Sequence, residues 1–232
     1  MTVQEAFLCL WKTLILTLMD VEKLLEGLDV DIWGVADVAE IEHTFHESVE
    51  RGKYRRALII GVRLLNDVLE TIRDRPTLLY KHHYKTVNWI LDQTAFRIAS
   101  RIRKAGYRAL PIAASQEVDW ERQLGHLSHK LVGYTAGIGW IGKSGLLIHP
   151  LHGPRVRYAT ILTDMPIEVT GQPLESQCGA CTACIDACPA GALSEEGYDM
   201  ERCLKKLREF AAIRGIGQLI CGICIQACPI GR

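Results

Sequence analysis

Eight of the nine cysteines lie within residues 178–232, and their spacing constrains this chain more than any other feature. The first run, CGACTACIDACP, spans residues 178–189. A single Cys203 follows, and a second run, CGICIQACP, spans residues 221–229. The first run has the C-x2-C-x2-C-x3-C-P spacing of bacterial proteins that hold two [4Fe–4S] clusters.

This spacing has a mechanical basis. Two intervening residues let a tight loop direct successive thiolates at one cluster, and three residues carry the chain into a short helix whose cysteine faces the other cluster. The second run lacks one cysteine of the full motif, and Cys203 is the natural substitute. We therefore predict two complete ligand sets, one of Cys178, Cys181, Cys184 and Cys228, and one of Cys188, Cys203, Cys221 and Cys224.

Zinc sites and disulfides explain the pattern less well. Zinc sites favour separated CxxC pairs, often with histidine, and all eight histidines precede residue 153. A disulfide framework requires export, which no segment supports. Cys9 stands alone on the apolar side of a predicted helix, where a buried thiol serves as a small hydrophobic group.

The N-terminal residues resemble a signal peptide only superficially. They lack a basic beginning, and Lys12 interrupts an apolar run that is too short to cross a membrane. We predict an amphipathic helical extension over residues 1–18, with Met19 as an alternative start, and a cytoplasmic protein without a membrane partner.

The formal net charge is zero, but it is unevenly distributed. Residues 1–50 carry eleven acids and two lysines, a balance of −9, whereas residues 51–108 carry fourteen Lys/Arg and four acids, a balance of +10. Two interpretations stay open: a phosphate-binding face, or oppositely charged faces that neutralise each other within one fold.

An α/β pattern precedes the cysteines. Continuous apolar runs predict buried strands, and apolar residues at helical spacing predict one long helix that ends before Gly106. Residues 165–177, rich in Pro and Gly, predict a linker. The predicted helices span residues 20–28, 45–51 and 78–104, and the predicted strands 31–35, 56–64, 107–112, 146–149 and 156–163.

A glycine-rich segment, residues 133–145, contains G-x-G-x-x-G but lacks the strand and helix of a dinucleotide-binding motif. Two interpretations are open: close approach of the backbone to a large ligand, or a tight structural loop. For the first we name Gly137, Gly139, Trp140, Gly142 and Lys143 as candidate cofactor contacts, with Arg155 as a second cation for a phosphate or carboxamide. His126 and His129 are three residues apart, and a hydrogen-bonded core or surface role is commoner than metal ligation.

The sequence resembles the epoxyqueuosine reductases and, more distantly, the cobalamin-dependent reductive dehalogenases. The resemblance rests on residues 136–147 (AGIGWIGKSGLL), residues 161–166 (ILTDMP) and the arrangement of the cysteines, and it extends over residues 32–229. It implies an α/β (α+β) fold: a nitroreductase-like, cobalamin-type domain over residues 19–170, then a ferredoxin-like module with two [4Fe–4S] clusters over residues 171–232.

Two departures from the resembled family bear on the substrate. The family has a C-terminal helical-repeat extension that helps to hold tRNA, whereas this sequence ends at Arg232 and reads as a short form. The family also has an acidic proton donor in an Asp-Ser-Ala-Pro-like stretch, which here reads PIAASQEVD over residues 111–119. Glu117 and Asp119 are the candidate substitutes.

Three functions follow from the resemblance. The first is an iron–sulfur oxidoreductase whose clusters pass electrons to a cobalamin-type cofactor, or less readily a flavin, in the α/β domain. The second is a ferredoxin-type electron carrier that docks on a separate corrinoid or flavin enzyme. The third is epoxyqueuosine reduction on tRNA. Each implies a low-potential electron donor such as ferredoxin or flavodoxin.

Overall fold

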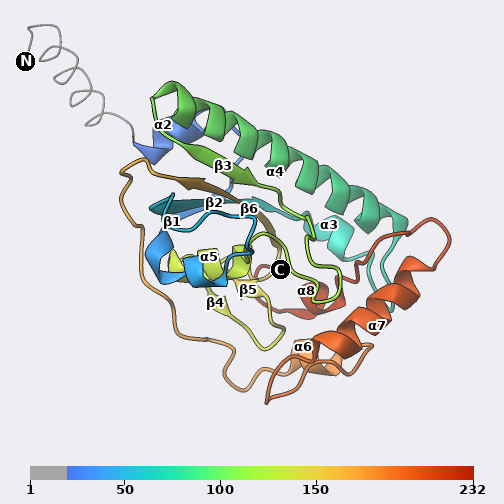
Figure 1. The fold of residues 1–232 in the computed structure, drawn as a ribbon. Coiled ribbons are helices and arrows are strands. Elements are labelled where there is room, and N and C mark those ends of the chain that lie inside the picture. Colours follow the sequence, from blue (N-terminus) through green and yellow to red (C-terminus); the bar gives the residue numbers. More distant parts are fainter. Residues whose placement is uncertain (1–19) are drawn as a thin grey trace, which may run out of the picture.

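The computed structural model describes residues 20–232, and a four-stranded antiparallel sheet lies at its centre (Figure 1). The predicted helical extension over residues 1–18 lies outside the described residues. The two central strands are β2 and β6, whose middle residues are almost fully buried because both faces of the sheet are covered. The strand order is β1 (Ile32–Asp37), β2 (Arg56–Arg63), β6 (Val156–Thr163) and β3 (Ala109–Ile112).

Helix α4 (Leu78–Lys104) covers one face of the sheet, as Figure 1 shows. The Thr77 hydroxyl caps its N-terminus by accepting the Tyr80 N–H at 3.1 Å, and Gly106, with φ of +91°, follows its last turn. Its buried face packs against Leu58, Ile60 and Ile161 of the central strands. The prediction of a helix over residues 78–104 is confirmed.

Smaller elements cover the opposite face. Helix α5 (His129–Thr135) and the hairpin of β4 (Trp140–Ile141) and β5 (Leu147–Ile148) pack below the sheet in the view of Figure 1. A second apolar cluster joins α5 to the sheet. The remaining elements before the cysteines are short: α2 (Val21–Leu25), η1 (Val38–Glu40), η2 (Glu42–Thr44) and α3 (Asn66–Leu69).

Two of the predicted elements differ in the structure. Residues 45–51 form successive turns, so the predicted helix is wrong. Phe45 and Val49 are both buried and four residues apart, which imitates a helical face, but the His46 ring accepts the Ser48 N–H and holds a turn instead. The first helix is shorter than predicted and ends before Gly27, whose φ is +67°.

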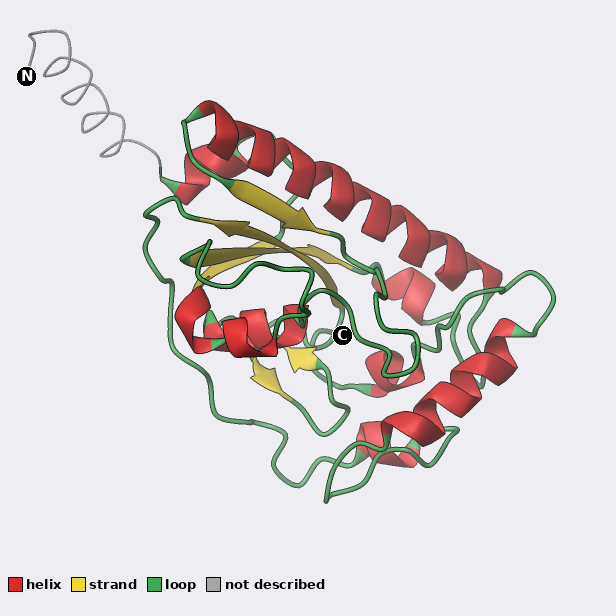
Figure 2. Ribbon diagram, viewed as in Figure 1, coloured by secondary structure: helices red, strands yellow, loops and turns green. Residues whose placement is uncertain are grey.

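The cysteine-containing segment, residues 171–232, contains short helices and no strand (Figure 2). These helices are α6 (Ala183–Asp186), α7 (Met200–Ala211) and α8 (Ile223–Ala227). The start of the predicted linker is not free: Met165 and Ile167 are buried in the core, and the Thr170 hydroxyl accepts the Val35 N–H at 2.9 Å. Among residues 20–232, no helix combines the length and apolar character needed to span a bilayer.

Candidate functional site

The eight C-terminal cysteines surround two cavities. The first thiol cavity has a volume of about 140 Å³ and is lined by Cys178, Cys181, Cys184 and Cys228. The second thiol cavity has a volume of about 120 Å³ and is lined by Cys188, Cys203, Cys221 and Cys224. The structure therefore brings the cysteines together in the two groups of four assigned from the sequence, and their role as iron ligands stays a prediction.

Local backbone geometry produces this grouping. Gly179 has a φ of +49°, and the Cys181 N–H donates to the Cys178 carbonyl at 3.0 Å, which closes a tight turn between the first two cysteines. Helix α6 then carries the chain to Cys188 in the second group. Helix α8 packs against α6 and returns Cys228 to the first group.

The geometry does not suit a single metal ion. The eight C-terminal cysteines are free thiols. Within residues 20–232, no three His, Cys, Asp or Glu side chains converge as a single metal ion requires. Tetrahedral zinc would draw its sulfurs to about 3.8 Å from one another, given Zn–S bonds of about 2.3 Å. Each cavity is instead roughly ten times the 10–15 Å³ that one water needs. Thiols spaced around such a cavity suit a multi-atom cluster.

The two groups of thiols differ in burial. Burial raises the pKa of Cys221 to about 11 and that of Cys224 to about 12. Cys181, in contrast, is exposed. Burial also raises the pKa of Cys178, but the backbone N–H of Lys143, the Trp140 indole N–H and a nearby hydroxyl together hold it below its usual value. The first group therefore lies nearer to solvent.

The glycine-rich segment approaches the protein's own chain closely. A Cβ on Gly137 would lie 2.7 Å from the Gln172 carbonyl oxygen, and one on Gly139 would lie 2.3 Å from that of Ile148. Gly142 packs on the Ile148 side chain, and an added Cβ would lie 3.4 Å from the Cys178 sulfur. Gly137 and Gly142 thus approach residues 171–178, whereas Gly139 closes the hairpin on itself. The role of these glycines as cofactor contacts stays a prediction.

The other candidate contacts from this region also touch the cysteine loops. Trp140 is 1% exposed, and its indole N–H has no hydrogen-bond partner other than the Cys178 sulfur nearby. Arg155 is 3% exposed and donates from Nη2 to the carbonyls of Gln226 and Cys228, at 3.1 and 3.0 Å.

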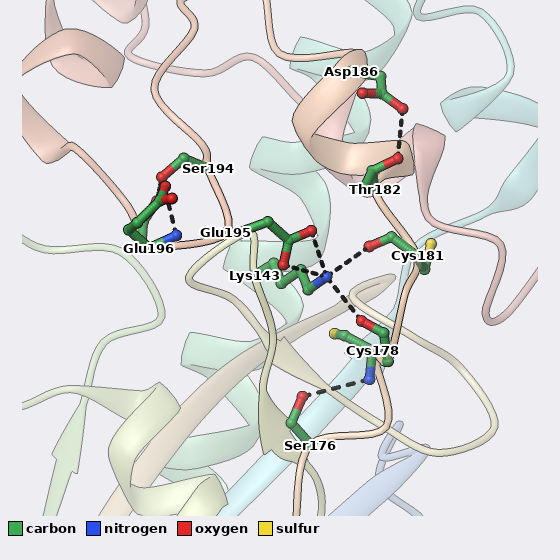
Figure 3. A network of polar contacts seen from close by, with 11 residues as sticks. Lys143, Ser176, Cys178, Cys181, Thr182, Asp186, Ser194, Glu195 and Glu196 are labelled. Carbon is green, nitrogen blue, oxygen red and sulfur yellow. Dashed lines mark hydrogen bonds and ion pairs between the residues drawn. The ribbon is translucent and has the colours of Figure 1, made fainter.

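Lys143 binds the loop of the first cysteines. Figure 3 shows its ammonium group between Cys181 and Glu195. The ammonium donates to the carbonyls of Gly179 and Cys181 at 2.8 and 3.2 Å, and to Oε1 of Glu195 at 2.8 Å. All three N–H donors of the ammonium thus have partners in the cysteine-containing segment.

A third cavity of about 310 Å³, the His129 cavity, lies beside the second thiol cavity. Strand β3 pairs only with residues 160–163 of β6, so the first half of β6 has an open edge here. Arg157 lines the cavity from one face of the sheet, and His129 and Tyr158 line it from the other. The Tyr158 hydroxyl is buried without a hydrogen-bond partner.

Hydrogen bonds fix the His129 ring. Its Nε2 lies 2.9 Å from the Ala113 carbonyl and its Nδ1 lies 2.8 Å from the Thr160 hydroxyl. A carbonyl only accepts, so Nε2 carries the proton and Nδ1 accepts from the hydroxyl. Burial lowers the pKa of His129 to about 4, so the ring is neutral near pH 7. The expectation of a hydrogen-bonded histidine is confirmed here.

The cationic groups of this cavity lack acidic partners. Arg157 donates to the Asn88 side chain at 3.0 Å and to the Ala114 carbonyl at 3.1 Å, and its guanidinium lies 4.4 Å from the Tyr84 ring centroid. Lys130 donates to a backbone carbonyl at 2.6 Å. Among residues 20–232, no Asp or Glu lines the cavity, so the described part of its wall carries net positive charge.

A fourth cavity of about 700 Å³, the outer groove, adjoins the His129 cavity. Asp119 lies on its wall, and Oδ1 of Asp119 accepts the backbone N–H groups of Glu121 and Arg122. Glu117 lies on none of the four cavity walls. The role of Glu117 or Asp119 as a proton donor stays a prediction.

The four cavities follow one another through shared wall residues. Ser144 lines both thiol cavities. Lys130 and Leu146 line the second thiol cavity and the His129 cavity. Ser128 and Lys130 line the His129 cavity and the outer groove. A continuous succession of sites therefore runs from the exposed Cys181 to the open edge of the sheet.

Sequence reasoning did not identify the His129 cavity as a site. Arg157 and Tyr158 lie in a strand that reads as buried sheet, and nothing in their spacing links them to residues of α5. The sequence signal that pointed here was the three-residue spacing of His126 and His129.

The sequence is similar to those of known proteins. No model of a protein family matches the sequence. Epoxyqueuosine reductases of Aliivibrio fischeri and Vibrio cholerae are 32% and 33% identical over 66% of this chain. That of Bacillus anthracis is 39% identical over 45% of it. The chain is related to the epoxyqueuosine reductases. It spans only 30% to 41% of the length of these three relatives.

Solved structures share the fold. A catabolic reductive dehalogenase in complex with 3-bromo-4-hydroxybenzoic acid has a TM-score of 0.70 at 19% identity, over 88% of this chain and 30% of the dehalogenase. The epoxyqueuosine reductase of Streptococcus thermophilus has a TM-score of 0.61 at 20% identity, over 90% of this chain and 64% of that one. An epoxyqueuosine reductase with an epoxyqueuosine-modified tRNA stem loop has a TM-score of 0.58 at 24% identity, over the same shares.

Proposed function

We propose that this relative of the epoxyqueuosine reductases is an iron–sulfur oxidoreductase that relays electrons through two [4Fe–4S] clusters to a cobalamin-type cofactor at the His129 cavity. The observation that carries the proposal is the succession of cavities, in which two sets of four thiols precede a positively charged cavity at the sheet edge. Residues 19–170 would form the cofactor domain and residues 171–232 the ferredoxin-like module.

The thiol cavities fit iron–sulfur clusters by their donor sets. Four cysteines line each one, the number that a [4Fe–4S] cluster takes. Such clusters supply one-electron transfer, at potentials that include about −400 mV and below. Cys181, which is exposed, marks the entry side, where a low-potential donor such as ferredoxin or flavodoxin would bind. The deeper second group lies nearer to the acceptor.

The His129 cavity and the outer groove fit a large organic cofactor. Ligand pockets commonly measure about 300–1,000 Å³, and these two adjoining cavities measure about 310 and 700 Å³. The Tyr158 hydroxyl lacks an acceptor, and Arg157 and Lys130 lack an anion, so a bound phosphate or carboxamide would satisfy them. A related dehalogenase structure is described as informing B12-dependent dehalogenation. Bound cobalamin would supply a metal that accepts the electrons.

Burial keeps Tyr158 and His129 in one protonation state near pH 7. Burial raises the pKa of Tyr158 well above its usual value, so its hydroxyl stays a donor. The neutral His129 adds no charge, and Arg157 and Lys130 supply the positive field. The substrate would enter by the outer groove. Because a related reductase is seen with a tRNA stem loop, tRNA is the first substrate to test.

Anaerobic reconstitution with iron and sulfide, followed by titration with cobalamin and with FMN, tests this function. We expect a shift in the cobalamin absorbance spectrum on binding, and at least tenfold weaker binding for Arg157→Gln and Tyr158→Phe. Arg208→Gln is the control, because Arg208 is exposed on α7 and lies on none of the four cavity walls. If loaded protein binds neither cofactor, the oxidoreductase proposal is wrong, and the chain is an electron carrier for a separate corrinoid or flavin enzyme.

Titration with tRNA at several salt concentrations tests the substrate. Contacts between cations and phosphates predict affinity that falls steeply with salt. Absent or salt-insensitive binding would exclude tRNA as the substrate.

A further inference from the structure

The stretch that holds the first cysteines has no cation of its own. Residues 158–201 contain eight Asp and Glu residues and no Lys or Arg. Cys178, Cys181 and Cys184 lie in this stretch and line the first thiol cavity. Positive charge beside these cysteines must therefore come from elsewhere in the fold.

Lys143 brings that charge from the glycine-rich loop. Its side chain is only 17% exposed, although the residues that it contacts lie at the surface. The ammonium donates to the carbonyls of Gly179 and Cys181, and Lys143 itself lines the first thiol cavity. Lys143 thus contacts the first cysteine loop through its side chain.

Glu195 partly neutralises this cation. Its carboxylate lies 2.7 Å from the Lys143 ammonium, and its own side chain is 55% exposed. Its neighbour Glu196 instead takes part in a turn with Ser194 and does not bond to Lys143 (Figure 3). The two glutamates therefore give a matched pair, since only one of them contacts the lysine.

We propose that the Lys143–Glu195 pair sets the reduction potential of the cluster bound in the first thiol cavity, with Lys143 raising it and Glu195 lowering it. This inference rests on the proposed function, because it requires bound clusters. Reduction adds one electron and hence one negative charge at the cavity, and breaks no bond. A nearby cation stabilises that added charge and a nearby carboxylate destabilises it.

The effect belongs to one cavity. Neither Lys143 nor Glu195 lines the second thiol cavity, where Lys130 and Lys206 provide the positive charge. Because Coulomb energies fall with distance and with solvent screening, the pair acts mainly on the nearer site. The pair would therefore give the first cluster a reduction potential different from that of the second cluster in the relay.

EPR-monitored redox titration of the reconstituted protein, with dithionite as reductant, tests this proposal. We expect Lys143→Met to lower one of the two midpoint potentials and Glu195→Gln to raise that same potential. Lys143→Arg should keep this midpoint potential close to the wild-type value. The midpoint potential of the double variant should lie between those of the two single variants. Glu196→Gln is the control and should shift it less than Glu195→Gln does.

A purely structural role for the pair predicts a different result. If the ion pair only held the loop in place, removal of either partner would shift the midpoint potential of the site in the same direction. Shifts of the same sign in Lys143→Met and Glu195→Gln, or unchanged potentials with full iron content, would overturn the proposal. If Lys143→Met fails to load iron, the sign of the shift in Glu195→Gln decides. Absence of iron from the wild type would instead contradict the proposed function.

Discussion

The sheet and the cysteine-containing segment are stabilised in different ways. The sheet has two apolar clusters in which Leu58, Ile59, Ile60, Ile161 and Leu162 are fully buried. Residues 171–232 contain helices of four, five and twelve residues, and within the longest of them only Phe210 is buried. The first cluster also includes Phe210, Ile216, Ile220 and Ile223, so the end of the cysteine-containing segment shares the core of the sheet. The rest of that segment arranges thiols around cavities, so its stability depends on what those cavities bind.

The largest expected difference between the two regions is their response to iron removal. Chelation under anaerobic conditions should make residues 171–209, which place no buried side chain in either apolar cluster, sensitive to protease while residues 20–170 stay protected. The cavities lose their central contacts on chelation, whereas the apolar clusters keep theirs. Mass spectrometry of the fragments measures the outcome. Equal protection of both regions after chelation would contradict the contrast.

A core substitution probes the sheet in the opposite way. Leu58→Ala removes a fully buried side chain from β2 and should lower the free energy of unfolding by about 2–5 kcal/mol. Denaturant titration of chelated protein measures this effect. Leu65→Ala, at a side chain that is 61% exposed, should change it by less than about 0.5 kcal/mol. Similar decreases in the free energy of unfolding for both variants would show that the buried core of the sheet does not dominate stability.

The neutral His129 makes the sheet region sensitive to acid. Its pKa is lowered to about 4 from 6.5, so the unfolded chain binds the proton more tightly than the folded one. Stability is therefore full above pH 6.5 and falls as the pH drops toward 4, by up to about 3 kcal/mol.

Unfolding of the chelated protein at several pH values measures this loss. His129→Gln should flatten the dependence, although His149, with a pKa also near 4, will retain its own contribution. His82→Gln on the exposed side of α4 is the control. An unchanged slope in His129→Gln would mean that this ring is not held neutral.

The smallest predicted effect concerns the junction of the two regions. The Thr170 hydroxyl accepts the Val35 N–H at 2.9 Å and donates to the Ala136 carbonyl at 3.0 Å. Thr170→Val should cost about 1 kcal/mol of stability and increase hydrogen exchange at Val35. Unchanged exchange there would show that the junction does not depend on this hydroxyl.

Strong local signals explain why much of the fold could be predicted. The long helix has a threonine cap, a regular apolar face and a glycine after its end, so its bounds follow from the sequence. The buried strands β2 and β6 have continuous apolar runs. The grouping of the cysteines follows from the C-x2-C-x2-C-x3-C-P motif, in which the last cysteine of a run faces the other cluster.

The wrong helix over residues 45–51 and the features that the sequence did not reveal lacked such signals. Phe45 and Val49 have helical spacing, but local side-chain bonds favour turns. Glycines in residues 137–142 indicate a close approach, but the sequence does not say that the neighbour is the chain itself. The His129 cavity exists because β3 is four residues long and leaves the edge of β6 open. Strand pairing of this kind is a tertiary property.

The central claim is that the two groups of thiols hold iron–sulfur clusters, and metal and sulfide analysis tests it most directly. Anaerobically purified protein should contain about eight iron and about eight acid-labile sulfide per chain. Cys224→Ser should lose about half of each, since Cys224 lines only the second thiol cavity. Stoichiometric zinc, or sulfur–sulfur crosslinks among these cysteines in place of iron and sulfide, would contradict the account.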